Sequence, residues 1–154
     1  MSDGSTYTVA SLASTLNATV QVPGSKSVAA RALVCAAMAL GESTVSNLPS
    51  GDDTASMLSG LATLGAKFEV HGDTAKFRSS WDVDQLDPLV LDAHLAGTTA
   101  RFLTAVSALR LGEVVITGEE ALRKRPMDDL HQALSDIGLD VSPLNGTGML
   151  PVAV

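Results

Sequence analysis

Apolar residues recur along this chain at two spacings, which predict short strands alternating with helices. Met57, Leu61 and Leu64 lie three or four residues apart and predict a helix over 52–64, whereas the Val- and Ile-rich run 113–117 is typical of a strand. The elements predicted in the first half are 18–22, 27–40, 43–46, 52–64, 67–71 and 74–78. Those predicted in the second half are 89–91, 98–111, 113–117, 127–137, 139–141 and 150–154.

The two halves repeat one order of strand, helix, strand, helix, strand and strand. Glycines mark equivalent points of the two copies at offsets of 73, 71 and 73 residues. The pairs are Gly24 and Gly97, Gly41 and Gly112, and Gly65 and Gly138. A nearly constant offset indicates a structural duplication, with units over about 18–80 and about 88–154. Residues 79–88 are the expected linker, and 142–148 the expected turn-rich loop.

The character of each helix predicts where it lies. The helix over 27–40 is apolar on nearly every side apart from Arg31, which predicts burial all round. The helices over 52–64 and 127–137 are amphipathic and are expected to lie outside it. The expected N-caps are Ser27, Asp52 and Thr98. The predicted fold class is therefore α/β (α+β), with buried apolar helices and sheets around them, and glycines that follow helices are expected in the left-handed conformation.

Length and composition narrow the class of protein. A chain of 154 residues fits one ordinary domain, and with 45% hydrophobic but only 3% aromatic residues its core must consist of Ala, Leu and Val. The formal net charge of −7 argues against a nucleic-acid surface. The single cysteine, Cys35, excludes an internal disulfide and a cysteine-based zinc site. The apolar run 32–40 is too short to cross a membrane, and 1–14 lacks a cationic secretory start, so a cytoplasmic location is expected.

The positive charges are unevenly placed for so acidic a chain. Six of the ten Lys and Arg residues lie at or just inside predicted helix N-termini. They are Lys26, Arg31, Arg101, Arg123, Lys124 and Arg125. Because cations oppose the positive end of the helix dipole, this placement indicates binding of an anion by free amides and side chains together. Ser27 and Thr98 add hydroxyl donors, and Gly24 and Gly97 leave room for a ligand beside the backbone.

Structural interpretations of the same residues stay open. Lys26 is equally consistent with a solvated loop lysine, Arg31 with the partner of a structural aspartate, and 123–125 with a solvated turn. The acidic pairs 52–53 and 128–129 are expected to stabilise helix starts rather than to act as catalysts or metal ligands. The three histidines show no metal-ligand spacing.

Two nucleotide-binding motifs are excluded. A phosphate-binding loop needs a glycine directly before its lysine, whereas Ser25 precedes Lys26. A dinucleotide-binding fingerprint needs further glycines at fixed spacings, and these are absent around Gly24. The anion expected at these helix starts therefore belongs to another class of ligand.

Three motifs carry a resemblance to a known family. Residues 22–27 (VPGSKS) followed by Arg31 resemble the first signature of 5-enolpyruvylshikimate-3-phosphate synthases. Residues 95–98 (LAGT) with Arg101–Phe102 resemble the second, and Arg125–Pro126 before a leucine-rich helix resembles the third. The three motifs occur in the family's order and at roughly its spacing.

The resemblance implies a fold of six βαβαββ units in two lobes. This chain is similar to the N-terminal portion, with two of the three units of one lobe. Residues 1–20 would be a leader and a strand belonging to the other lobe, and 21–154 a partial lobe. The missing remainder of the enzyme would then be a partner of this piece, which alone is expected to be inactive.

The resemblance also implies a reaction: transfer of the enolpyruvyl group of phosphoenolpyruvate to the 5-hydroxyl of shikimate 3-phosphate, with release of phosphate. It implies that Lys26 contacts both substrates and takes part in proton transfer. Ser27 and Arg31 would hold shikimate 3-phosphate, Gly97 would leave room for phosphoenolpyruvate, and Arg125 would pair with its phosphate or carboxylate. The resemblance implies no metal or organic cofactor, no membrane and no nucleic acid.

Two positions depart from the family pattern, and two other functions stay open. Ala30 and Leu95 stand where the family commonly has Asn. One alternative is the related enolpyruvyl transferase that acts on UDP-N-acetylglucosamine, which usually carries Gly-Ala-Lys-Asn where this chain has Gly-Ser-Lys-Ser. The other is a non-catalytic anion-binding or interaction module.

Overall fold

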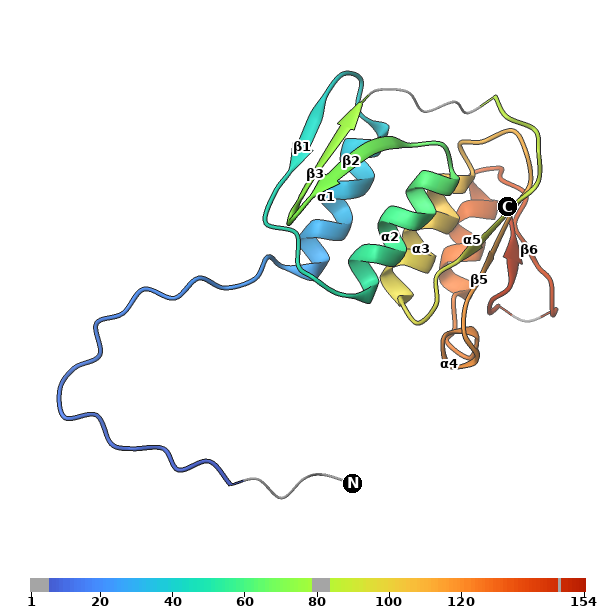
Figure 1. Ribbon diagram of the computed structural model, residues 1–154. Helices are drawn as coiled ribbons and strands as arrows, with labels where there is room; N and C mark the ends of the chain where they lie inside the picture. Colours follow the sequence, from blue (N-terminus) through green and yellow to red (C-terminus); the bar gives the residue numbers. More distant parts are fainter. Residues whose placement is uncertain (1–5, 79–83, 147) are drawn as a thin grey trace.

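The computed structural model describes residues 6–78, 84–146 and 148–154 (Figure 1). In the first half the elements are α1 (Lys26–Met38), β1 (Ser43–Val45), α2 (Asp52–Thr63), β2 (Lys67–His71) and β3 (Thr74–Arg78). In the second half they are β4 (Leu89–Asp92), α3 (Gly97–Ser107), β5 (Val114–Thr117), α4 (Glu120–Arg123), α5 (Asp128–Asp136), β6 (Ser142–Pro143) and β7 (Val152–Ala153). The expected linker 79–88 and loop 142–148 lie partly outside the described residues.

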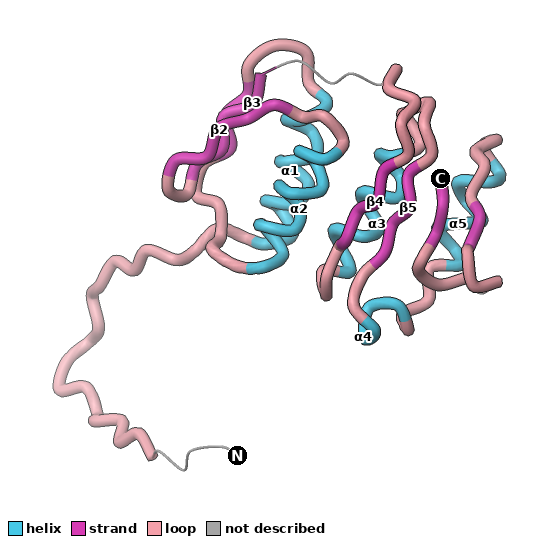
Figure 2. Tube along the Cα trace, turned by 45° about the vertical axis from the view of Figure 1, so that its right-hand side comes forward, coloured by secondary structure: helices cyan, strands magenta, loops and turns pink. Residues whose placement is uncertain are grey.

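Two sheets flank the helices. The first sheet has the order β1-β3-β2 and is antiparallel, with Phe68 opposite Phe77. The second has the order β4-β5-β7-β6, in which β4 and β5 run parallel and the other pairs antiparallel. Figure 2 shows α1 and α2 beside the first sheet and α3 beside β4 and β5. Helix α2 packs against both α1 and α3, so it joins the two halves.

The predicted duplication is visible in the connectivity. The order β1-β3-β2 of the first half recurs as β5-β7-β6 in the second, again antiparallel. Gly65 and Gly138 follow equivalent helices with φ angles of +102° and +94°. Each is followed by an amide that donates to a carbonyl five residues back, at 2.9 Å for Ala66 and 3.2 Å for Leu139. The two helices therefore end in the same way, as their glycines predict.

Small and aliphatic side chains build the core. Most buried apolar residues in the described part of the chain are Ala, Leu or Val, as the composition predicts. Phe77 is the large exception, and its ring lies 4.9 Å from that of Phe68, centroid to centroid. Gly60 of α2 is buried, and a Cβ there would lie 2.2 Å from Cδ1 of Leu103 on α3. The absence of a side chain at Gly60 therefore allows α2 and α3 to pack closely.

The prediction that the helix over 27–40 is buried on every side is wrong for this chain. Ala29, Leu33 and Ala36 of α1 face the core. The opposite face is exposed, with Val28 65% and Met38 47% accessible. Part of the apolar surface of α1 is therefore left uncovered, because the described residues pack against only one side of the helix.

Three predicted N-caps were also placed too late. Ser25, not Ser27, caps α1, and its hydroxyl accepts a hydrogen bond from the amide of Val28 at 3.4 Å. Helices α2 and α3 begin after Gly51 and Ala96, neither of which supplies a side-chain cap. Asp52 and Thr98 accordingly lie inside the first turns, where Asp52 still interacts favourably with the helix dipole.

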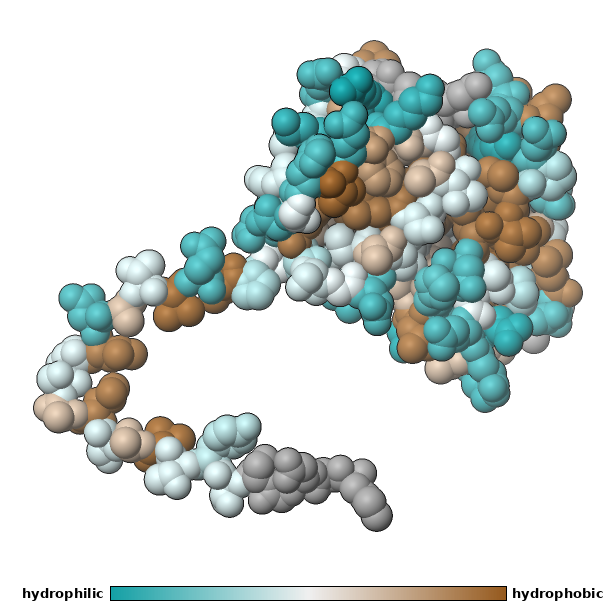
Figure 3. Space-filling view, in the orientation of Figure 1, coloured by the Kyte–Doolittle hydropathy of each residue, from teal (hydrophilic) through white to brown (hydrophobic). Residues whose placement is uncertain are grey.

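The predicted strand over 18–22 is not formed. Residues 6–25 contain no helix or strand and extend away from the body (Figure 1). Figure 3 shows apolar side chains exposed along this segment, and Val20 and Val22 are 75% and 66% accessible. A strand needs a neighbour for its backbone donors and acceptors, and this segment pairs with none of the described strands.

Smaller differences affect the second half. The strand predicted over 139–141 is replaced by β6 at Ser142–Pro143, because the amide of Leu139 is used to end α5. The strand predicted over 150–154 shortens to β7. The four-residue α4 was not predicted, since so short a helix shows no apolar periodicity.

Candidate functional site

A pocket of about 590 Å³ lies where the first turns of α1 and α3 come together. Its lining residues are Lys26, Ser27, Asp53, Leu95, Gly97, Thr98, Arg101 and Arg125. Lys26 and Ser27 open α1, and Gly97 and Thr98 open α3. Helix first turns carry amides without intrahelical partners and the positive end of the dipole. The two helix starts and the three cationic side chains thus give this pocket, called the anion pocket below, the properties expected of an anion-binding site.

Gly97 brings two guanidinium groups close to the start of α3. A Cβ at this position would lie 3.1 Å from Nη1 of Arg125 and 3.3 Å from Nη1 of Arg101. Any side chain here would therefore crowd both guanidinium groups. The absence of a side chain at Gly97 keeps the backbone at the start of α3 open beside these two groups. The role of Gly97 in binding a ligand stays a prediction.

Arg101 fastens the loop that carries Arg125. Its Nη1 donates to the carbonyl of Gly97 at 3.1 Å and its Nη2 to the carbonyl of Pro126 at 2.8 Å. These two bonds connect the first turn of α3 to the residue directly after Arg125. The sequence marked Arg101 as one of six cations and as part of the second motif, but its bond across 25 residues could not be found from local spacing.

Lys26 is the first residue of α1 rather than a loop residue, and its exposed side chain has an ion-pair partner. Its Nζ lies 2.6 Å from Oδ2 of Asp53, the second residue of α2. The lysine side chain is 66% exposed and the aspartate side chain 28%. The expectation that Asp53 serves only the start of its helix is therefore incomplete, because its carboxylate also lines the anion pocket.

Arg31 lies one turn along α1 and is exposed. Its Nη1 donates to the carbonyl of Ser27 at 2.9 Å and also to the Ser27 hydroxyl, and its guanidinium stands 5.4 Å from the ring centroid of Phe102. The alternative interpretation, in which Arg31 is a buried partner of a structural aspartate, is thus wrong. Four expected site residues, Lys26, Ser27, Gly97 and Arg125, line one pocket, and Arg31 contacts the second of these.

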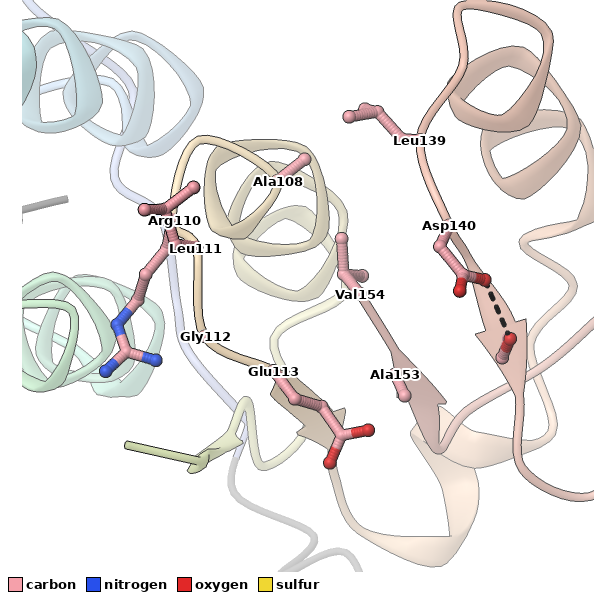
Figure 4. Close-up of a pocket in the computed structure, with 10 residues that line it drawn as sticks. Ala108, Arg110, Leu111, Gly112, Glu113, Leu139, Asp140, Ala153 and Val154 are labelled. Atoms are coloured by element: carbon pink, nitrogen blue, oxygen red, sulfur yellow. Dashed lines mark hydrogen bonds between the residues drawn. The ribbon is translucent and has the colours of Figure 1, made fainter. Parts of the chain in front are cut away.

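A second pocket, of about 350 Å³, lies at the other end of α3 (Figure 4). Its polar wall includes Glu113 and Asp140, and Asp140 accepts a hydrogen bond from the Ser142 hydroxyl at 3.2 Å. The guanidinium of Arg110 is buried, and Figure 4 shows it turned away from Asp140. Its three nitrogens have no hydrogen-bond partner in the described part of the chain. None of the expected site residues lies here.

The described residues contain no group of three or more His, Cys, Asp or Glu side chains placed to hold a metal ion. They also include no helix long and apolar enough to cross a membrane. Among the histidines, His131 is buried with neither ring nitrogen bonded to a described group. Burial lowers the pKa of His131, and the nearby Asp128 carboxylate partly opposes this change.

Comparison with known families decides what this arrangement is related to. The sequence profile of EPSP synthase (3-phosphoshikimate 1-carboxyvinyltransferase) matches residues 11–154. The chain belongs to the EPSP synthase family. Residues of all three motifs line the anion pocket, and the chain belongs to the family that those motifs resemble.

Relatives of this EPSP synthase family member include two bacterial 3-phosphoshikimate 1-carboxyvinyltransferases. That of Nostoc sp. is 34% identical over 151 residues, covering 97% of this chain and 36% of the relative. That of Yersinia ruckeri is 42% identical over 126 residues, covering 77% of this chain and 29% of the relative. The chain thus spans about a third of the length of the curated relatives that it matches.

A solved structure shares the fold. EPSP synthase from Acinetobacter baumannii superposes with a TM-score of 0.75 at 24% sequence identity, covering 88% of this chain and 31% of that one. The enolpyruvyl transferase fold that the motif resemblance implies is thereby confirmed. The division into a leader over 1–20 and a partial lobe over 21–154 stays a prediction.

Proposed function

We propose that the protein carrying this chain transfers the enolpyruvyl group of phosphoenolpyruvate to the 5-hydroxyl of shikimate 3-phosphate and releases phosphate. The observation that carries the proposal is the meeting of Lys26, Gly97 and Arg125 in one pocket at two helix starts. Both substrates carry phosphate and carboxylate groups, and such groups are held well by helix amides and guanidinium groups.

Each residue has a chemical role in this proposal. Arg125 binds the phosphate or carboxylate of phosphoenolpyruvate, beside the open backbone of Gly97. Ser27 and Arg31, already bonded to each other, hold shikimate 3-phosphate. Lys26 contacts both substrates and takes part in proton transfer. Its place at the first residue of α1 puts its ammonium group on the wall of the same pocket.

The reaction balances as addition followed by elimination. The 5-hydroxyl group loses its proton to a base as its oxygen adds to C2 of phosphoenolpyruvate, and C3 gains a proton from an acid, which forms a tetrahedral intermediate. Loss of phosphate from C2 and of a proton from C3 then restores the double bond. The residues of this chain supply anion binding and one proton-transfer group, and the proposal assigns the remaining ligands and acid–base groups to the rest of the enzyme. A cytoplasmic location and the remainder of the enzyme as partner belong to the same proposal.

The test is phosphate release by the full-length protein from phosphoenolpyruvate and shikimate 3-phosphate. Lys26→Ala is expected to lower kcat at least about 100-fold, because general acid–base groups typically contribute that much. Lys76→Ala is the control, since it removes an exposed lysine of β3 outside the pocket. Full turnover by the Lys26 variant would remove this residue from the mechanism.

Two further arms separate the alternatives. Replacing shikimate 3-phosphate by UDP-N-acetylglucosamine in the same assay tests the related transferase, which would release phosphate only with the nucleotide sugar. Residues 1–154 alone are expected to release none. Turnover by this piece would contradict the assignment of essential groups to the rest of the enzyme.

A further inference from the structure

The carboxylate of Asp53 is the anionic side chain lining a pocket that otherwise gathers Lys26, Arg101 and Arg125. An anion-binding pocket gains nothing electrostatically from a carboxylate in its wall, because like charges repel the ligand. Asp53 nevertheless stands 2.6 Å from the ammonium of Lys26 and is the less exposed member of the pair. Its presence therefore calls for a role other than attracting the ligand.

Asp53 is held from two sides. It belongs to the first turn of α2, where a carboxylate interacts favourably with the helix dipole. Its own carbonyl accepts a hydrogen bond of 3.5 Å from the hydroxyl of Thr99 on α3. The backbone of Asp53 is thus tied to the helix start that forms the opposite wall of the pocket.

Lys26, by contrast, has a long side chain with four rotatable bonds, and 66% of it is exposed. Among the described residues, Asp53 is the one ion-pair partner of Lys26. Without that contact the ammonium would sample many positions around the first turn of α1. The ion pair confines it to the side of the helix that faces Gly97 and Arg125.

We propose that Asp53 is the positioning residue for Lys26. Its carboxylate holds the Nζ of Lys26 at the pocket wall and, as a negative charge, weakens the attraction of the pocket for anionic ligands. The effect expected on turnover rests on the proposed function, whereas the effects expected on phosphate binding and on chemical labelling of Lys26 do not. Removing the carboxylate therefore has opposite effects on two measurements. Anion binding strengthens because a negative charge is gone, and turnover falls because the ammonium is no longer held in place.

Asp53→Asn in the full-length protein tests the proposal, with Asp52→Asn as matched control. The control removes the same charge from the neighbouring residue of the same helix turn, and Asp52 does not line the anion pocket. Inorganic phosphate is the binding probe. Asp53→Asn is expected to bind it up to about fivefold more tightly, with kcat lowered about tenfold or more. Asp52→Asn should stay within about twofold of wild type in both.

A third readout follows Lys26 itself and needs no turnover. The rate at which an amine-reactive ester modifies Lys26, measured by mass spectrometry, is expected to rise in Asp53→Asn and to stay unchanged in Asp52→Asn. A wild-type protein without turnover would end the proposed function, while this labelling rate still decides the role of Asp53. Unchanged labelling and unchanged kcat in Asp53→Asn would overturn the inference.

Asp53→Glu keeps the test decisive if the Asn variant does not fold. It retains the charge and lengthens the side chain by one methylene, so phosphate affinity should stay near wild type while kcat falls. Full kcat in Asp53→Glu together with a wild-type Lys26 labelling rate would show that the position of this carboxylate is unimportant.

Discussion

The two halves of the molecule share an antiparallel trio of strands but differ by one strand. In the second half β4 pairs with β5 in parallel, beginning with the amide of Leu89 donating to the carbonyl of Glu113 at 3.0 Å. The predicted counterpart in the first half, 18–22, is exposed and unpaired with any described strand. Both segments have strand-like sequences, so the difference shows that a strand forms only where a neighbouring edge satisfies its backbone.

The comparison also locates the pocket. Equivalent helices of the two halves, α1 and α3, each contribute their first turn, and α2 lies between them in contact with both. Neither half alone assembles the group formed by Lys26, Asp53 and Arg125. The pocket is therefore a product of how the two units dock, and the variants that disturb this docking should have the largest effects.

The largest effect is expected from Gly60→Val at the contact between the halves. Its Cβ would begin 2.2 Å from Cδ1 of the fully buried Leu103, so either this side chain must move within the core or α2 and α3 must separate. Overpacking of this kind should lower the free energy of unfolding by about 3 kcal/mol, measured by urea denaturation of the full-length protein. Ser59→Val is the control, because it adds the same side chain to the neighbouring exposed position of α2. Equal stability of the two variants would contradict the close packing of the halves.

A smaller effect, on binding, is expected from Arg101→Ala, which removes the link between the first turn of α3 and the loop that carries Arg125. Both hydrogen bonds, to Gly97 and Pro126, are lost. Because hydrogen bonds from charged groups are worth about 1.5–3 kcal/mol, phosphate affinity should fall about tenfold or more by titration calorimetry. Lys67→Ala, an exposed change in β2, should leave the affinity unaltered. An unchanged affinity in the Arg101 variant would show that Arg125 needs no such support.

Next in size are Gly65→Ala and Gly138→Ala, which test whether the halves end their outer helices alike. Both glycines have positive φ angles and open space around a Cβ, so only backbone strain is added. Each variant should lose about 1–2 kcal/mol in the free energy of unfolding. A large cost at one glycine and none at the other would break the equivalence of α2 and α5.

The sequence predicted the features that depend on residues close together along the chain. The main helices, the glycines that end them and the candidate site residues Lys26, Gly97 and Arg125 could be found because each follows from local spacing or a short motif, although the capping residues were misplaced by one or two positions. The role of Asp53 could not, since its contact with Lys26 exists only after α1 and α2 pack together. The exposed face of α1 and the unpaired segment 18–22 could not be foreseen for a related reason, because burial and pairing depend on what lies alongside.

The smallest effect concerns a position where the two halves differ in chemistry. The offset of 73 residues makes Leu58 in the first half the sequence equivalent of His131 in the second. His131 is buried, and burial holds its pKa below the value of 6.5 expected in an unfolded chain. As pH falls below 6.5, the unfolded state therefore binds more protons than the folded state, and stability declines.

His131→Leu copies the first half into the second and should remove this loss. The free energy of unfolding of the full-length variant, compared between pH 7.5 and pH 5.5, is expected to fall less than that of wild type, by about 1 kcal/mol or less. His71→Leu is the control, because its side chain is 71% exposed and its removal leaves the burial of His131 unchanged. An identical pH dependence in His131→Leu and wild type would mean that the buried imidazole is protonated as easily in the fold as outside it, contrary to its buried position without a bonded partner among the described residues.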